Sequence, residues 1–213
     1  MQKVTSPAVG VSLSTPAARL SIGAGVAALV FLVALHALSP EFDPSWRMVS
    51  EYALGEYQWV LSLMFFAWGL STLALFFAVR RQINPRGGKI GLGLLIISAI
   101  GMGMAIIFDV SHPLHGLATL LGIPTFPAAA LLISASLGRD PAWKPFRRSL
   151  LVMANLTWIS LGLMLAMLFI GLGKTGGAFT PEVWIGWPNR LLIVAYCAWV
   201  MVTAQGMIQL HRQ

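Results

Sequence analysis

Charged residues and cysteines are both scarce in this chain. Only 10% of its 213 residues are Asp, Glu, Lys or Arg, whereas 57% are hydrophobic. Soluble globular domains carry about 25% charged residues, so the composition excludes a soluble domain. The single cysteine, Cys197, excludes a disulfide, a CxxC motif or a thiolate metal site within one chain. A lone cysteine in an apolar segment usually acts as a small hydrophobe.

Acidic residues are the rarer of the two charge types. Seven acidic residues stand against fourteen basic ones, which gives a net charge of +7. Such an excess can indicate nucleic-acid binding, but here the basic residues flank apolar segments. In that position they set orientation in a membrane and meet anionic lipids. We therefore predict membrane lipids as partners and no nucleic acid.

Long apolar stretches fill most of the chain. A bilayer core of about 30 Å needs about 20 helical residues to cross it. We predict an all-α, polytopic integral membrane protein, with a mobile cytoplasmic tail at 1–18 and a single six-helix domain at 19–213. The predicted transmembrane helices lie near 19–38, 57–79, 90–110, 114–138, 149–172 and 190–209.

The basic residues between these helices are sorted by side. Three fall on one side, Arg47, Lys174 and Arg190. The other eleven fall on the opposite side: Lys3, Arg19, Arg80, Arg81, Arg86, Lys89, Arg139, Lys144, Arg147, Arg148 and Arg212. Short cytoplasmic loops carry the excess of Lys and Arg in membrane proteins. We therefore predict that both termini are cytoplasmic.

Small residues and prolines interrupt two of the predicted helices. Ser98, Gly101 and Ala105 share one face of the third helix, where small side chains let backbones approach closely in lipid. Pro124 and Pro127 are expected to kink the fourth helix and to free backbone carbonyls within the membrane.

Polar chemistry gathers on the predicted outer face. Asp43-Pro44 has the pattern of a helix start, and we predict a short amphipathic helix over 44–54 at the outer interface. Within it, Arg47 and Glu51 have the spacing of an i,i+4 pair. Tyr52 and two tryptophans suit the headgroup layer, where aromatic side chains concentrate; the tryptophans are Trp184 and Trp187.

The segment Asp109-Val-Ser-His112-Pro-Leu-His115 joins the third and fourth helices through a short turn. We expect Asp109 to end one helix, His115 to lie in the first turn of the next, and His36 to reach the same level. Three interpretations stay open. The cluster can be structural, with Asp109 accepting hydrogen bonds from a helix end, Ser111 or His112 and pairing with Arg47. It can form a non-metal ligand site, or a metal site built from Asp109, His112 and His115.

The stretch from His36 to Gly55, followed by Asp109 and His115-Gly116, resembles an uncharacterised family of six-helix prokaryotic membrane proteins, domain of unknown function nine-nine-eight. Its members often carry a further histidine at the position that Thr119 occupies here. The resemblance implies six helices in the cytoplasmic (inner) membrane of a prokaryote and assigns no activity. It also implies one outer-face site that includes Ser50, Glu51, Asp109 and His115.

From these features we predict a non-enzymatic role. The protein would bind or sense a lipid or small amphiphile in an outward-facing polar pocket, or act as an accessory subunit with other membrane-protein subunits. The alternatives are a membrane lipid hydrolase that uses zinc or a His/Asp pair, with zinc not the favoured cofactor, and a small transporter. The candidate ligand-binding residues are His36, Arg47, Ser50, Glu51, Tyr52, Asp109, His115, Trp184, Trp187 and Arg190.

Overall fold

The fold is all-α in the residues that the computed structural model describes, 14–84 and 86–212. In chain order its elements are α1 (Ser14–Leu38), the 3₁₀ helix η1 (Val49–Leu54), α2 (Gln58–Val79), α3 (Arg86–Ile107), α4 (His115–Gly122), α5 (Thr125–Leu137), the 3₁₀ helix η2 (Pro141–Phe146), α6 (Arg147–Lys174) and α7 (Gly186–Leu210).

Six segments of these described residues are long and apolar enough to cross a membrane, with α4 and α5 together forming one of them. The predicted all-α class and the six spans are therefore confirmed, and the chain is a multi-pass membrane protein. The helices extend beyond the predicted bounds at several ends, because flanking residues such as Arg86 and Arg147 still form helical turns. Of the tail predicted at 1–18, residues 14–18 belong to α1, and 1–13 lie outside the described residues.

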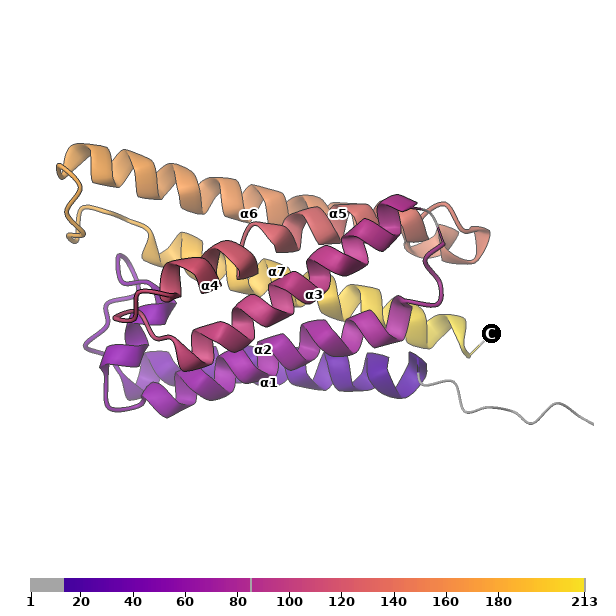
Figure 1. Cartoon of the computed structure of the whole chain (residues 1–213), viewed down its shortest axis with the longest axis horizontal. Helices are drawn as coiled ribbons and strands as arrows, with labels where there is room; N and C mark the ends of the chain where they lie inside the picture. The colour runs from indigo at the N-terminus through magenta and orange to yellow at the C-terminus, as the bar shows by residue number, and fades with distance from the viewer. Residues whose placement is uncertain (1–13, 85, 213) are drawn as a thin grey trace, which may run out of the picture.

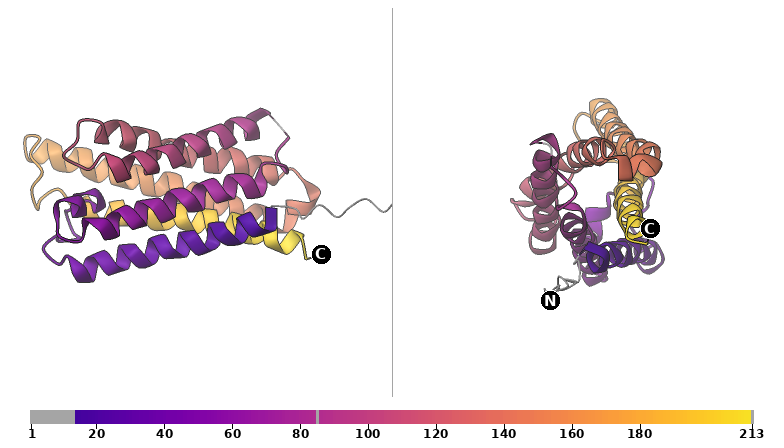
Figure 2. Two further views of the ribbon diagram at one scale, coloured as in Figure 1. Left: turned by 60° about the horizontal axis from the view of Figure 1, so that its bottom comes forward. Right: turned by 90° about the vertical axis from the view of Figure 1, so that its right-hand side faces the viewer.

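The helices run side by side and form a closed ring (Figures 1 and 2). Around it, α1 packs on α2, α2 on α3, α3 on α4 and α5, α5 on α6, α6 on α7, and α7 back on α1. At one end lie His36, His112, His115 and η1; we call it the histidine end, and it is the left-hand end in Figure 1. The opposite end carries the α2–α3 connection and η2; we call it the basic end.

Small residues on α3 set its close approach to α4, as the sequence predicts. A Cβ atom added to Gly101 would lie 2.3 Å from the backbone nitrogen of Gly122, which no real side chain could occupy. Ser98, also buried, donates its hydroxyl to the Gly122 carbonyl over 2.7 Å. The backbones of α3 and α4 are therefore in direct contact, and a larger residue at Gly101 would force the two helices apart.

The fourth span breaks at its prolines, as predicted. Helix α4 ends at Gly122 and α5 begins at Thr125. Because Pro127 has no N–H, the carbonyl of Ile123 four residues earlier loses its helical partner. The Tyr196 hydroxyl of α7 donates to that carbonyl over 2.8 Å. Side chains of neighbouring helices thus satisfy the carbonyls that the break exposes within the membrane.

The amphipathic helix predicted over 44–54 is wrong in its first half, since η1 spans only Val49–Leu54. The Asp43 carboxylate accepts the Ser45 amide in a tight local turn instead of starting a helix. The carbonyls that a helix would use internally are taken by α7. Gly186 N–H donates to Ser45 O over 3.1 Å, and Arg190 donates to Arg47 O over 2.7 Å. Tertiary contacts therefore hold this segment as a loop.

Candidate functional site

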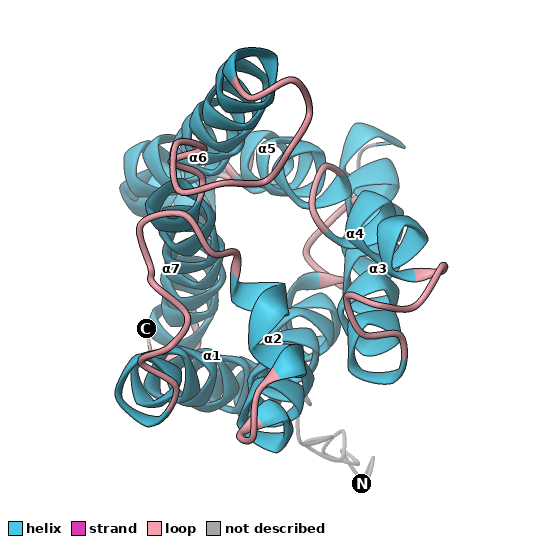
Figure 3. Cartoon of the chain, turned by 90° about the vertical axis from the view of Figure 1, so that its left-hand side faces the viewer, coloured by secondary structure: helices cyan, strands magenta, loops and turns pink. Residues whose placement is uncertain are grey.

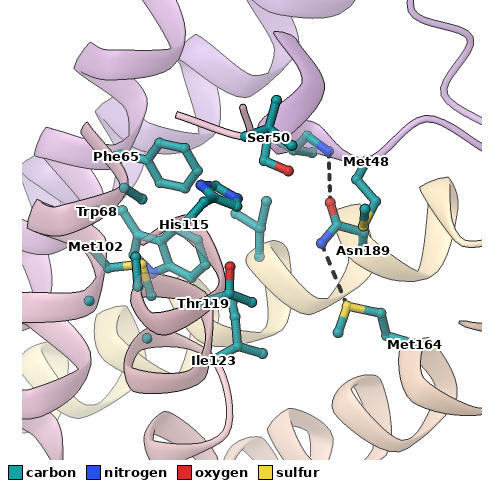
Figure 4. Close-up of a pocket in the computed structure, with 17 residues that line it drawn as sticks. Met48, Ser50, Phe65, Trp68, Met102, His115, Thr119, Ile123, Met164 and Asn189 are labelled. Carbon is teal, nitrogen blue, oxygen red and sulfur yellow. Dashed lines mark hydrogen bonds between the residues drawn. The ribbon is translucent and has the colours of Figure 1, made fainter. Parts of the chain in front are cut away.

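A cavity of about 160 Å³ opens among the helices at the histidine end (Figure 4). Residues of η1, α2, α3, α4, α6 and α7 line it, together with parts of the loops beside η1 and α4. Most of the wall is apolar: Phe65 and Trp68 form one side, Met102 lies beside them, and Met164 lies across from them. Four polar side chains reach the same space, those of Ser50, His115, Thr119 and Asn189.

His115 presents a hydrogen-bond acceptor to this cavity. Its Nδ1 lies 2.9 Å from the carbonyl oxygen of Phe108. A carbonyl only accepts, so Nδ1 must carry the proton and donate. In the neutral imidazole, Nε2 then holds a free lone pair, and no residue of the described chain donates to it. The turn before α4 thus fixes both the ring and its tautomer.

Two hydroxyl groups beside His115 also lack protein partners. Neither Ser50 nor Thr119 forms a side-chain hydrogen bond within 14–84 and 86–212, and both line the cavity. Figure 4 shows the Ser50 hydroxyl above the His115 ring and the Thr119 hydroxyl below it. Ser50 and His115 are partly buried and Thr119 is exposed, so the two hydroxyls and Nε2 of His115 remain free to bind water or a ligand.

The Asn189 side chain connects three elements of the cavity wall through two hydrogen bonds. Its Oδ1 accepts the backbone N–H of Val49 over 2.9 Å, and its Nδ2 donates to the Met164 sulfur over 3.6 Å. These two bonds, dashed in Figure 4, join η1, α7 and α6 around the same space. Trp68 forms part of the wall with 1% of its surface exposed, and its indole N–H has no partner among the described residues.

A second polar cluster lies at the same end and centres on Arg190, which is 4% exposed. Its Nε donates to His36 Nε2 over 2.7 Å, and its Nη2 donates to the Tyr52 hydroxyl over 3.0 Å. Its Nη1 donates to the carbonyls of Arg47 and Gly186, at 2.7 and 3.0 Å. One guanidinium therefore joins α1, η1, the loop before η1 and α7.

His36 is neutral in this arrangement. Its Nδ1 donates to the Leu32 carbonyl over 2.7 Å, which leaves Nε2 as the acceptor for Arg190. The ring also stacks on Trp187, with centroids 6.2 Å apart. Within the described chain no carboxylate lies within ion-pair distance of Arg190, and its hydrogen-bond partners are all uncharged. The cluster is therefore a structural junction in which four of the five guanidinium N–H donors are engaged.

The predicted site residues thus fall into separate groups. The junction around Arg190 contains His36, Tyr52, Trp187 and the backbone of Arg47. The cavity is lined by Ser50 and His115. The Arg47 guanidinium pairs with Glu51 at 2.6 Å, which confirms the predicted i,i+4 pair. Glu51 also accepts the Met48 amide. Trp184 is 67% exposed and is neither in the cavity lining nor a hydrogen-bond partner of Arg190.

Asp109 is engaged locally. Its carboxylate accepts both the hydroxyl and the amide of Ser111, and these bonds hold the pKa of the carboxyl below its usual value of 3.8. His112 is exposed, and its Nδ1 accepts the Leu114 amide over 3.1 Å. Among the described residues no group of three or more His, Cys, Asp or Glu side chains is arranged to hold a metal ion. The hydrogen bonds from Ser111 agree with the structural interpretation of Asp109, whereas the predicted pairing with Arg47 is wrong, because Arg47 pairs with Glu51.

Several residues of the cavity were not predicted from the sequence. The cavity lining also contains Trp68, Met102, Met164 and Asn189, and nothing in the sequence distinguishes these residues from ordinary packing residues of apolar helices. Only the family resemblance pointed to Thr119, as the position where other members often carry a histidine. It lies one helical turn after His115, and that i,i+4 spacing was the available signal that both side chains face the same space.

The helices and this cavity define a multi-pass membrane protein with a largely apolar, partly polar pocket at one end. The chain belongs to the family described as Protein of unknown function (DUF998), whose model matches residues 22–206. This match confirms the resemblance inferred from the sequence. No curated protein and no solved structure matches the chain significantly.

Proposed function

We propose that this protein binds a lipid or another small amphiphile in the cavity at the histidine end. The observation that carries the proposal is the combination of an apolar wall with three polar atoms that have no hydrogen-bond partner among the described residues, the Ser50 and Thr119 hydroxyls and Nε2 of His115. Ligand sites typically combine a mostly apolar lining with a few convergent polar groups that orient the ligand. An amphiphile matches both parts of this lining.

The size of the cavity limits what it can enclose. Its volume of about 160 Å³ is close to that of engineered cavities of about 150 Å³ that bind benzene. Pockets that enclose drug-sized ligands measure about 300–1,000 Å³. The cavity would therefore enclose the polar head and the first part of a chain, while the remainder of the chain stays in the bilayer.

The histidine end would face the outside of a prokaryotic cytoplasmic membrane. The basic end carries Arg80, Arg81, Arg139 and Arg148, in agreement with the positive-inside rule. A single introduced cysteine reports the orientation, because the native Cys197 is fully buried. In intact cells, an impermeant maleimide should label Glu56→Cys and spare Arg139→Cys. The reverse pattern would overturn this orientation.

The binding proposal is tested by filling the cavity. Ala105 lines it from α3, and Ala105→Phe would occupy space that the ligand needs. Ala166→Phe is the matched control, because Ala166 is exposed on α6 and lies outside the cavity lining. Native mass spectrometry after mild detergent extraction should show a retained amphiphile on the unmodified protein and on Ala166→Phe, but not on folded Ala105→Phe. Equal retention by both variants would refute binding in this cavity.

A further inference from the structure

We propose that the ligand is an uncharged amphiphile with a hydroxyl headgroup, which enters sideways from the bilayer between α4 and α6 and donates a hydrogen bond to Nε2 of His115. This inference rests on the proposed function and specifies the ligand of the same cavity. It follows from the charge of the lining, from the tautomer of one histidine and from the packing of two helices.

The lining favours an uncharged headgroup. None of the side chains around the cavity is an Asp, Glu, Lys or Arg. Arg190 lies one residue after Asn189 of the lining, but four of its five N–H donors are already engaged by neighbouring groups. A carboxylate or phosphate placed in this cavity would be largely desolvated beside a neutral His115, with no Lys or Arg side chain in the lining to pair with it, which costs far more than burial of a hydroxyl. Charged amphiphiles are therefore disfavoured.

The tautomer of His115 requires a donor on the ligand. Because Nδ1 donates to the Phe108 carbonyl, Nε2 can only accept in the neutral ring. An ether or ester headgroup has acceptors but no donor, and would leave this lone pair unmatched. A hydroxyl group donates to Nε2 and can also accept a hydrogen bond from a neighbouring hydroxyl of the lining, so an alcohol matches both the acceptor and the donors of this cavity.

The route of entry follows from the break in the fourth span. On the basic-end side of the break, α5 packs on α6. On the histidine-end side, α4 packs mainly on α3. Figures 1 and 3 show α4 and the histidine-end half of α6 lying apart. Thr119 of α4 lines the cavity and is nevertheless exposed, while Met164 of α6 lines it from the other side. The proposed entrance therefore lies beside Thr119, between α4 and α6.

A competition experiment tests the headgroup. The protein, in nanodiscs of phosphatidylcholine, is labelled with a dodecanol that carries a photoreactive diazirine on its chain. Competitors are 1-dodecanol, dodecyl methyl ether and ionised dodecanoate, compared at equal concentration in the membrane. Dodecanol should compete about fivefold better than the ether, the loss expected for one net hydrogen bond. Dodecanoate should compete more weakly still.

The variants identify His115 as the acceptor. His115→Phe keeps an aromatic ring and removes Nε2, so the preference for the alcohol over the ether should disappear. His112→Phe is the matched control in the same turn, because His112 is exposed and outside the lining; this variant should keep the preference. The preference is a ratio measured on one variant, so a general loss of stability does not imitate its disappearance.

The outcomes separate this inference from the proposed function. Labelling inside the cavity together with equal competition by alcohol, ether and carboxylate, or a preference unchanged in His115→Phe, would overturn the headgroup assignment alone. Stronger competition by dodecanoate would also overturn it. Labelling confined to the outer helix faces, without competition by any of the three compounds, would overturn the proposed function itself.

Discussion

Substitution of Arg190 by methionine should destabilise the protein more than any other exchange of a single arginine in the described chain. The guanidinium is buried and donates to His36, Tyr52 and the Arg47 carbonyl, and methionine can replace none of these bonds. Each buried acceptor left without a donor costs about 1–3 kcal/mol. With the Tyr52 hydroxyl able to turn to another partner, two acceptors remain, His36 Nε2 and the Arg47 carbonyl. Their summed cost is about 2–6 kcal/mol, and because both are only partly buried the lower part of this range applies. We therefore expect a loss of about 3 kcal/mol.

Thermal unfolding in detergent measures this loss. For a chain of about this length, each kcal/mol lowers Tm by about 2–4 °C, so Arg190→Met should unfold about 6–12 °C lower. Arg47→Met is the control, because it removes a partly exposed pair with Glu51 and keeps the backbone carbonyl that Arg190 uses. Such pairs contribute at most about 1 kcal/mol. Equal shifts for the two variants would refute the role assigned to Arg190.

Three further predictions concern the fold and the turn before α4. Tyr196→Phe leaves the Ile123 carbonyl without its donor and should lower the free energy of unfolding by about 1–3 kcal/mol, measured by denaturant titration in micelles; an unchanged value would contradict the pairing. Gly101→Val should separate α3 from α4 and reduce the yield of folded protein, whereas Gly103→Val, at a position with open space, should not. The Asp109 carboxyl should titrate by NMR below 3.8, and Ser111→Ala should raise its pKa toward that value. Because the pKa is lowered in the folded state, the stability that Asp109 adds is present above about pH 3.8 and is lost as the pH falls through the lowered pKa.

The sequence predicts the helices well because the bilayer imposes length and hydropathy on each span. The break in the fourth span was equally predictable, since Pro127 removes a backbone donor wherever it lies in a helix. Close packing of α3 also followed from its small residues. By contrast, the helix predicted to start at Asp43 does not form there. Gly186 and Arg190, far away in the chain, donate hydrogen bonds to the backbone carbonyls of that segment.

The site was less predictable because hydropathy does not distinguish a lipid-facing position from a cavity wall. Arg190 has the position of an ordinary basic residue at a helix end, and nothing local shows that three other elements converge on it. His36 and His115 were correctly assigned to one end, yet the structure gives them different partners, Arg190 and the Phe108 carbonyl. Met164 and Trp68 become cavity residues only through the arrangement of the helices.

The most direct test of the central claim is a crystal structure grown from a lipid phase that contains a monoacylglycerol brominated near its headgroup. Bromine can be located by its anomalous scattering even when the chain around it is poorly ordered. Binding in the cavity predicts an anomalous peak between Trp68 and Met164, beside the His115 ring. Anomalous peaks along the outer helix faces with none in the cavity would contradict the claim.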